Sequence, residues 1–234
     1  MEKLRIGLIG ANGRMGRTVA AVAGKDPSLT LSGQVDRDDS LAEVIDACDV
    51  VIDFSVADAT EETCRICADH HKPLVLGTTG HGVAQKETVA RAGKKIPIVF
   101  AANFSLGVNA LFALAGRAAE LLGPEFDLDV IEMHHRTKKD APSGTAKRLL
   151  KILSEARAGR DEIRAQSIRA GDIVGEHSVI FSGPGERLEL THRAGSRETF
   201  AVGALRAARW VVDQPPGLYR MEDVISSPQG QQRA

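Results

Sequence analysis

The stretch from Glu132 to Ala146, which reads EMHHRTKKDAPSGTA, gathers an acid, two imidazoles and several cations in one short segment. Two histidines precede two lysines, and Pro142 and Ser143 follow at positions typical of a helix start, where N–H groups are unpaired or capped. A helix start presents free backbone N–H groups and a partial positive charge, which suit a carboxylate or a phosphate. The stretch therefore predicts a site for a small anion with a proton donor beside it.

The residue types in this stretch suggest how the work is divided. Histidine titrates near neutrality, so His134 or His135 is suited to donate a proton, and the opposite orientation of adjacent strand residues favours one donor and one positioning group. Lys138 can hold a carboxylate and stabilise developing negative charge, and the helix start at Gly144 and Thr145 offers a second anion site. A zinc site from the two histidines is disfavoured because adjacent ligands fit tetrahedral coordination poorly, so we expect no metal.

A glycine-rich loop follows the first apolar run of the sequence, Leu4 to Ile9. The loop from Gly10 to Gly16 reads GANGRMG and leads into a helical pattern that continues to about Gly24. In a dinucleotide-binding fingerprint, such glycines allow a tight turn, approach of the pyrophosphate and close packing of the helix. Asn12 occupies the usual place of the second glycine, and the loop alone is equally typical of a simple turn.

The second expected strand, Leu29 to Val35, ends in Asp36 and Arg37. An acid about 20 residues beyond a glycine loop binds the ribose hydroxyls of NAD, whereas an arginine can pair with the 2′-phosphate of NADP. The two residues together predict that NADH and NADPH are both accepted. The alternative is a solvated, charged turn, because two further aspartates follow directly.

Strands and helices alternate through the first half of the chain. Apolar runs at 49–54, 73–76 and 97–100 predict strands, and helical patterns separate them. Repeated units of this kind fold into a parallel, doubly wound sheet, with ligands bound beyond the carboxyl ends of the strands. The residues at these ends, small or polar except for Phe54, are Phe54, Ser55, Gly77, Thr78, Thr79, Ala102 and Asn103. Each group could be an ordinary turn, but their coincidence at one edge fits a nicotinamide and its ribose.

The regular alternation of strand and helix patterns ends after residue 105. The expected elements are a helix at 108–122, a strand at 126–133, a helix at 143–158, strands at 163–168, 172–181 and 186–192, a helix at 199–212 and a short element at 221–225. Several consecutive strands favour a second, α+β domain with a mixed or antiparallel sheet. The polar tail at 226–234 is expected to fray.

The bulk composition is that of a globular protein. The chain has 234 residues and a net charge of −1, which creates no global field toward nucleic acid or a membrane. No apolar run approaches the roughly 20 residues that a membrane span needs. The N-terminus leads directly into a strand pattern without a signal peptide, which predicts a cytoplasmic protein.

Three cysteines, Cys48, Cys64 and Cys67, are too few for a disulfide framework. The CxxC spacing at Cys64 and Cys67 allows a redox or zinc interpretation, but no preceding strand and turn or second ligand pair accompanies it. We therefore interpret these residues as buried thiols that pack like small apolar side chains.

Taken together, the motifs resemble those of the dihydrodipicolinate reductase family, the 4-hydroxy-tetrahydrodipicolinate reductases of the diaminopimelate route to lysine. The matching segments span nearly the whole chain and read GANGRMG, VIDFS, GTTG, AANFSLGVN, EMHHRTKKDAPSGTA, RAGDIVGEH and ERLELTHRA. The segment at 36–49 is shorter than in many members of the family, which leaves the preference between NADH and NADPH open.

The resemblance implies a Rossmann-like dinucleotide-binding domain at 1–105, to which 197–234 returns, and a substrate-binding and oligomerisation domain at 106–196 that forms a homotetramer. It implies that NADH or NADPH reduces a cyclic unsaturated imine dicarboxylate, with His134 as the proton donor and Lys138 as the assisting lysine. The implied substrate contacts are His135, Lys138, Gly144 and Thr145. The implied cofactor contacts are Gly10, Ala11, Asn12, Gly13, Arg14, Met15, Asp36, Arg37, Gly77, Thr78, Thr79, Ala101, Ala102, Asn103 and Phe104.

Two other functions fit parts of the sequence. An amino-acid dehydrogenase that acts through an imine would have a similar architecture, and turnover of an amino acid would identify it. A dinucleotide-sensing module without catalysis would bind NADPH but would not need the cluster of acid, cation and helix start. Fold alone does not decide among these functions, whereas the Glu132–Ala146 stretch favours the reductase.

Overall fold

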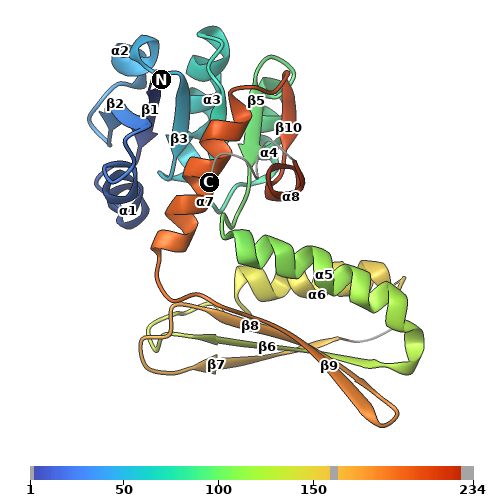
Figure 1. Cartoon of the computed structure of the whole chain (residues 1–234). Coiled ribbons are helices and arrows are strands. Elements are labelled where there is room, and N and C mark those ends of the chain that lie inside the picture. The colour runs from blue at the N-terminus through green and yellow to red at the C-terminus, as the bar shows by residue number, and fades with distance from the viewer. Residues whose placement is uncertain (1–2, 159–162, 228–234) are drawn as a thin grey trace. The chain divides into compact units, whose positions relative to one another are not determined.

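The computed structural model describes residues 3–158 and 163–227 and divides the chain into two compact units (Figure 1). Unit 1 comprises Met1–Ser105 and Glu198–Ala234, and unit 2 comprises Leu106–Arg197. The expectation for the tail falls largely on residues 228–234, which lie outside the described part of the chain.

Unit 1 contains a parallel sheet of six strands in the order β10-β5-β4-β3-β1-β2. The strands are β1 (Leu4–Ile9), β2 (Leu29–Val35), β3 (Val50–Asp53), β4 (Leu74–Leu76), β5 (Pro97–Phe100) and β10 (Gly217–Tyr219). The central strands are continuous apolar runs because helices cover both faces of the sheet. The prediction of a doubly wound, Rossmann-like sheet is confirmed.

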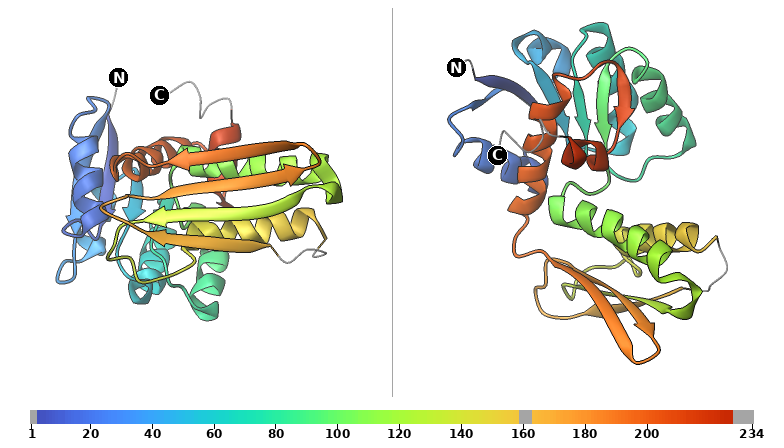
Figure 2. Two further views of the ribbon diagram at one scale, coloured as in Figure 1. Left: turned by 90° about the horizontal axis from the view of Figure 1, so that it is seen from below. Right: turned by 45° about the vertical axis from the view of Figure 1, so that its right-hand side comes forward.

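Helices lie on both faces of this sheet (Figures 1 and 2). They are α1 (Arg14–Ala23), α2 (Leu41–Val44), α3 (Thr60–Asp69), α4 (Val83–Ala92), α7 (Glu198–Val211) and α8 (Met221–Ser226). Helix α7 packs against α1 and crosses β3, β4 and β5, whereas α3 packs against α4 on the opposite face. The C-terminal segment therefore completes the fold of unit 1.

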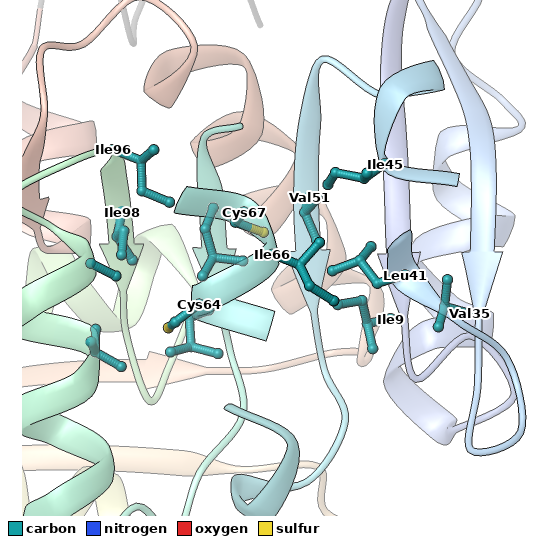
Figure 3. Close-up of a cluster of buried hydrophobic side chains, with 14 residues drawn as sticks. Ile9, Val35, Leu41, Ile45, Val51, Cys64, Ile66, Cys67, Ile96 and Ile98 are labelled. Atoms are coloured by element: carbon teal, nitrogen blue, oxygen red, sulfur yellow. The ribbon is translucent and has the colours of Figure 1, made fainter. Parts of the chain in front are cut away.

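The core between the sheet and helices α2, α3 and α4 includes two of the three cysteines (Figure 3). Cys64 and Cys67 lie on one face of α3, and together with Cys48 they are buried and free. Burial raises the pKa of the Cys64 thiol to about 12, so the neutral thiol is the form present. The prediction that these thiols are buried is confirmed.

Unit 2 contains a mixed sheet of four strands in the order β7-β6-β8-β9. Its elements are α5 (Leu106–Leu122), β6 (Asp127–His134), α6 (Gly144–Ala156), β7 (Arg164–Arg169), β8 (Glu176–Gly183) and β9 (Glu186–Arg193). Strand β7 is parallel to β6, whereas β8 is antiparallel to both β6 and β9. Helices α5 and α6 lie side by side along one face of the sheet (Figure 2).

Strand β6 alternates between buried and more exposed residues, as expected for a sheet with one covered face. Its buried row begins with Leu128 and Val130, which belong to the core under α5 and α6, and continues with Glu132 and His134. The fold thus places a carboxylate and an imidazole at the end of an apolar row, where each needs a polar partner.

Helix α5 is more apolar than the sequence analysis allowed. By length and composition alone, the segment Leu106–Glu125, with a mean hydropathy of 1.2, could cross a membrane, and the expectation that no run is long enough was wrong for it. Such a single helix is weak support for a span. Phe112, Ala115 and Ala119 of this helix belong to the core of unit 2.

Other differences concern short elements and element ends. The short helix α2 and the three-residue strand β10 were not expected, because so few residues carry little periodic signal. Strand β8 begins at Glu176 rather than at residue 172, since Gly171 has a positive φ of 50° and begins a turn. Helix α3 begins at Thr60, after a 3₁₀ turn at Ala57–Ala59.

Candidate active site

The glycine loop after β1 turns sharply at Gly10, which has a φ of +75°. A Cβ on Gly16 would lie 2.1 Å from the carbonyl oxygen of Gly10, so only glycine lets α1 pack this close to the loop. Helix α1 begins at Arg14, and its N-cap, Gly13, provides no side-chain hydrogen bond to the first turn. The first N–H groups of α1 are therefore left for an anion, as in a pyrophosphate site.

Asp36 lies at the carboxyl end of β2, beside this loop. Its carboxylate accepts hydrogen bonds from the backbone N–H of Asn12 at 2.8 Å and of Arg37 at 2.9 Å. The hydrogen bond from Asn12, followed by that from Arg37, holds the pKa of Asp36 below its usual value. The residue that we predicted to contact a ribose is thus ionised and fixed against the glycine loop.

Two cavities in unit 1 lie at the carboxyl ends of the strands. One, of about 440 Å³, is lined by Arg14, Met15, Phe54, Ser55, Gly77, Thr78, Thr79, Ala102, Asn103, Phe104 and Phe200. The other, of about 410 Å³, includes Gly10, Gly13, Asp36 and Arg37 among its lining residues. Phe54 and Ser55 line both cavities, so the two form neighbouring compartments of one extended site.

All predicted cofactor contacts line one of these cavities except Ala11, Asn12 and Ala101. Ala11 is buried, the backbone of Asn12 holds Asp36, and the N–H of Ala101 donates to the carbonyl of Leu76 at the end of β4. Phe200 was not predicted, because only the crossing of α7 over the sheet brings it to the cavity from the far end of the chain. The residues of this edge fit a dinucleotide: glycines where backbones approach, an uncapped helix start and an acid at β2.

A buried carboxylate stabilises the edge of the sheet where β3 and β4 end. Asp53, at the end of β3, is fully buried, and its Oδ1 accepts from the N–H of Ser55 at 2.7 Å and the hydroxyl of Thr78 at 3.0 Å. The bond to Thr78 ties the turn after β4 to the end of β3, so the cavity wall is held by hydrogen bonds within the sheet edge.

In unit 2, His134 is the last residue of β6 and is 8% exposed. Its Nδ1 is hydrogen-bonded to Oε2 of Glu132, two residues earlier on the same face. Its Nε2 has no hydrogen-bond partner among the described residues. A Cβ on Gly175 would lie 3.1 Å from Nε2, so the glycine keeps the space beside this nitrogen open.

Glu132 is fully buried and is held by several donors. Arg169 on β7 binds it in bidentate fashion, with Nη1 3.0 Å from Oε2 and Nη2 2.8 Å from Oε1. The backbone N–H of Ser143 lies 3.3 Å from Oε1. Burial raises the pKa of Glu132, but hydrogen bonds from Arg169, Ser167 and His134 outweigh it and lower the pKa to about 2.

The segment after β6 carries the remaining predicted residues. His135 leaves the strand and its Nδ1 lies 2.8 Å from the Thr137 hydroxyl, so the two histidines have different surroundings. The ammonium of Lys138 pairs with Asp140 at 2.8 Å. Lys139 is exposed, as expected for a solvated side chain.

Helix α6 begins at Gly144, after the N-cap Ser143, whose hydroxyl accepts from the N–H of Ala146 at 3.1 Å. The same hydroxyl lies 3.1 Å from Nε2 of His177 on β8. No atom would lie within 4 Å of a Cβ on Gly144, so the helix start is open there, and Thr145 is half-buried beside it. The capped start and the lysine are anion-binding groups of the kind that two carboxylates require.

The pKa of His134 reflects opposing influences. Burial lowers it, the hydrogen bond and charge of Glu132 raise it, and the cations Lys138 and Arg169 lower it again, so that it lies below the usual value. Burial, with the charge of His134, lowers the pKa of His177 to about 4. His177 is therefore neutral near pH 7, and its ring stands edge-on to that of His134 at a centroid distance of 5.1 Å.

Glu132, His134 and His177 are close enough to hold a metal ion by distance alone. The zinc site that we weighed from the sequence used His134 and His135 instead. The carboxylate of Glu132 is already shared by His134 and the Arg169 guanidinium, and Nε2 of His177 is paired with Ser143. A cation at Glu132 would meet the guanidinium charge at close range, so the donor set suits proton chemistry better than metal binding.

Comparisons with known proteins show which family the sequence matches. The family model described as dihydrodipicolinate reductase, N-terminus, matches residues 4–104, and the C-terminus model matches residues 107–225. The 4-hydroxy-tetrahydrodipicolinate reductase of Halorhodospira halophila is 44% identical, covering 95% of this chain and 98% of its own. The protein of the same name from Akkermansia muciniphila is 46% identical, over 92% of this chain and 95% of its own.

Solved structures give the same fold. The dipicolinate-bound dihydrodipicolinate reductase of Paenisporosarcina sp. TG-14 superposes with a TM-score of 0.84 at 23% identity, over 94% of this chain and 99% of its own. A diaminopimelate dehydrogenase of Corynebacterium glutamicum reaches a TM-score of 0.63 at 14% identity, over 97% of each chain. The alignment with the Halorhodospira enzyme spans 264 positions, more than this chain has residues, so that relative carries insertions.

Proposed function

The chain belongs to the dihydrodipicolinate reductase family, and we propose that His134 is the proton donor of its reaction. The protein reduces 4-hydroxy-tetrahydrodipicolinate with NAD(P)H in diaminopimelate and lysine biosynthesis. The observation that carries the proposal is the surroundings of His134, which has one nitrogen fixed by a carboxylate and the other open.

The chemistry requires an acid of this kind. A bound nicotinamide supplies a hydride to a conjugated imine, and the electron-rich enamine that results must be protonated. A buried histidine, whose pKa burial holds below its usual value, can deliver that proton and regain one from solvent. Because Nδ1 faces Glu132, the proton leaves from Nε2.

The anion-binding groups near His134 suit a cyclic dicarboxylate. Lys138 can turn from Asp140 to a substrate carboxylate, and the open helix start at Gly144 and Thr145 can bind the second one. His135 completes the substrate site as a positioning group. In unit 1, the edge formed by the glycine loop and the strand ends binds the cofactor. Asp36 faces the ribose hydroxyls of NADH, and Arg37 pairs with the 2′-phosphate of NADPH.

Assembly and location complete the proposal. A homotetramer would form through the sheet of unit 2, where Ile131, Met133 and Ile180 alternate with the buried rows of β6 and β8 and are half-buried. Light scattering of the purified protein tests this assembly. The three free thiols suit the reducing conditions of the cytoplasm, and cell fractionation tests that location.

Steady-state kinetics with each cofactor test the function. Substrate would be made in situ from pyruvate and aspartate semialdehyde, and oxidation of NADH or NADPH would be followed by absorbance. We expect turnover of the cyclic imine and none of free amino acids. Turnover of an amino acid alone would indicate a dehydrogenase, and cofactor binding without oxidation would indicate a sensing module; either result contradicts the proposal.

A further inference from the structure

Fully buried Glu132 forms an ion pair with half-buried Arg169, and the two side chains contact both the proton donor and the segment that carries Lys138. Strand β7 runs parallel to β6 with Arg169 opposite His134, so the guanidinium reaches the carboxylate across one strand spacing. Two hydrogen bonds join these side chains in bidentate geometry, the strongest arrangement between an arginine and a carboxylate. Replacing an ion pair that includes a buried charge with apolar residues often leaves a protein at least as stable. The presence of this pair therefore points to a role other than stability.

The carboxylate determines which nitrogen of His134 carries a proton. An ionised carboxylate can only accept hydrogen bonds, and Oε2 of Glu132 lies against Nδ1. Nδ1 must therefore be the protonated nitrogen of the neutral ring, and Nε2 is the nitrogen that gains and loses the second proton. The alternative tautomer would leave a lone pair facing the carboxylate.

The guanidinium reaches the other half of the site. Beyond Glu132, Arg169 donates to the carbonyl oxygen of Asp140 at 2.6 Å and to that of Lys138 at 3.3 Å. These carbonyls belong to the segment that carries the anion-binding lysine. The same cation thus connects the backbone of the substrate-binding segment to the carboxylate that orients the proton donor.

From these contacts we propose that Glu132 and Arg169 are positioning residues, which fix the tautomer and orientation of His134 and hold the Lys138–Asp140 segment beside it. The proposal rests on the role of His134 given above. Neither residue touches the reacting atoms, so both act through their neighbours.

The pair also balances charge around the imidazole. The ionisable groups that face His134 are Glu132 on its own strand, Arg169 on β7, His177 on β8 and Lys138 on the following segment. The carboxylate favours the imidazolium, and the guanidinium disfavours it. Their opposite charges therefore partly offset each other at the imidazole.

Opposite charge changes should therefore move the titration of His134 in opposite directions. Glu132→Gln keeps an oxygen that can accept from Nδ1 but removes the negative charge, so the pKa of His134 should fall. Arg169→Gln leaves the carboxylate uncompensated, so the pKa should rise. In Glu132→Gln/Arg169→Gln both charges are gone, and the pKa should return toward the wild-type value.

Heteronuclear NMR of the imidazole nitrogens in the full-length protein measures the pKa and the tautomer of His134 in each variant, without a need for enzyme activity. We expect shifts of about one pH unit or more in opposite directions for the single variants, and a protonated Nδ1 in the wild type. Shifts in the same direction, no shift in any folded variant, or a protonated Nε2 in the neutral wild-type ring would overturn the proposal. The double variant keeps the test valid if Arg169→Gln alone does not fold, since it buries no unpaired charge.

Kinetics distinguish the two proposed roles of the pair, which are to fix His134 and to hold the Lys138–Asp140 segment. The decrease of kcat/KM at alkaline pH (the alkaline limb) should occur at the pKa of His134 that NMR measures in each variant. Arg169→Lys keeps the charge but loses the bidentate fork and the bonds to both carbonyls, so it should raise KM for the substrate several-fold with little movement of the limb. An unchanged KM would contradict the tie to the Lys138–Asp140 segment.

Arg117 and Glu120 on α5 form an exposed ion pair that provides the matched control. Neutralising them singly and together should change neither the titration nor KM. The pKa of His134 could shift as proposed while neither the wild type nor any variant reduces the cyclic imine. In that case the positioning role stands and the proposed function fails. The two claims are thus tested separately.

Discussion

The two units differ in the groups that form their candidate sites. In unit 1, the candidate cofactor site is formed mainly by the backbone. It consists of a glycine turn, an uncapped helix start and the carboxyl ends of parallel strands. In unit 2, side chains form the site: a carboxylate and two imidazoles are buried near the end of an apolar strand row, and a half-buried guanidinium pairs with the carboxylate. Binding of a dinucleotide tolerates many side chains, whereas proton transfer depends on the charge state of one.

The comparison predicts different sensitivities. A site built from backbone should fail when a side chain is added where none fits, and should tolerate most changes of charge. A site built from buried charges should fail when one charge is removed, even if the shape stays the same. Four changes test this contrast.

The largest effect is expected from His134→Gln, which keeps the size of the side chain but removes the acid. We expect kcat to fall by roughly 10²- to 10⁴-fold, the usual contribution of a general acid, with little change in the dissociation constant for NADPH. Stopped-flow turnover and fluorescence titration measure the two quantities. The control is His70→Gln in unit 1, where the ring pairs with Asp46. Equal kinetics in mutant and wild type would refute the assignment.

Gly16→Ala should be next in size and should act on the other unit. Its methyl group would lie 2.1 Å from the Gly10 carbonyl, so the glycine loop must shift and NADPH affinity should fall at least about tenfold. The control is Gly24→Ala, whose Cβ would lie 3.4 Å from the nearest atom in a helical conformation. Calorimetric titration with NADPH measures both, and equal affinities would contradict the backbone account of unit 1.

The charged cluster in unit 2 should also appear in the stability of the protein. The pKa of Glu132 falls from 4.5 to about 2 on folding, so its stabilisation is complete above about pH 5 and is lost as pH falls toward 2. Between pH 6 and pH 3 the wild type should lose about 2 kcal/mol more than Glu132→Gln in the free energy of unfolding. Urea denaturation at both pH values gives the difference, with the exposed Glu120→Gln as the control; equal losses in wild type and Glu132→Gln would sink this interpretation.

The smallest effect is expected from Arg37→Ala in unit 1. Only NADPH carries a 2′-phosphate, so the change should raise KM for NADPH by several-fold more than KM for NADH. The N–H of Asn12 still holds Asp36 in the variant, so the proposed contact of Asp36 with the ribose of NADH should remain. Comparable losses for both cofactors would show that Arg37 is part of a solvated turn.

The same contrast explains what the sequence could predict. The glycine loop, the acid after β2 and the polar strand ends are local patterns, and the parallel sheet brings them to one edge automatically. His134, Lys138 and the start of α6 lie in one short segment, so their neighbourhood was also predictable.

The partners of His134 were not predictable in this way. Arg169 lies 37 residues beyond Glu132, on a strand that is largely exposed and has no clear alternation to fix its register. His177 reaches the site through an antiparallel pairing, and Gly175 matters only for the space it leaves. Phe200 depends on the path of α7 over the sheet. Long-range pairing decides each of these, and residue patterns do not encode it.

The pH dependence of kcat/KM for the cyclic imine, compared between wild type and His134→Gln, tests the central claim most directly. A general acid must be protonated, so the wild-type rate should fall as pH rises through the pKa of His134. The variant has no such group, so its slower rate should lack this limb. The same alkaline limb in both proteins would contradict the claim that His134 delivers the proton.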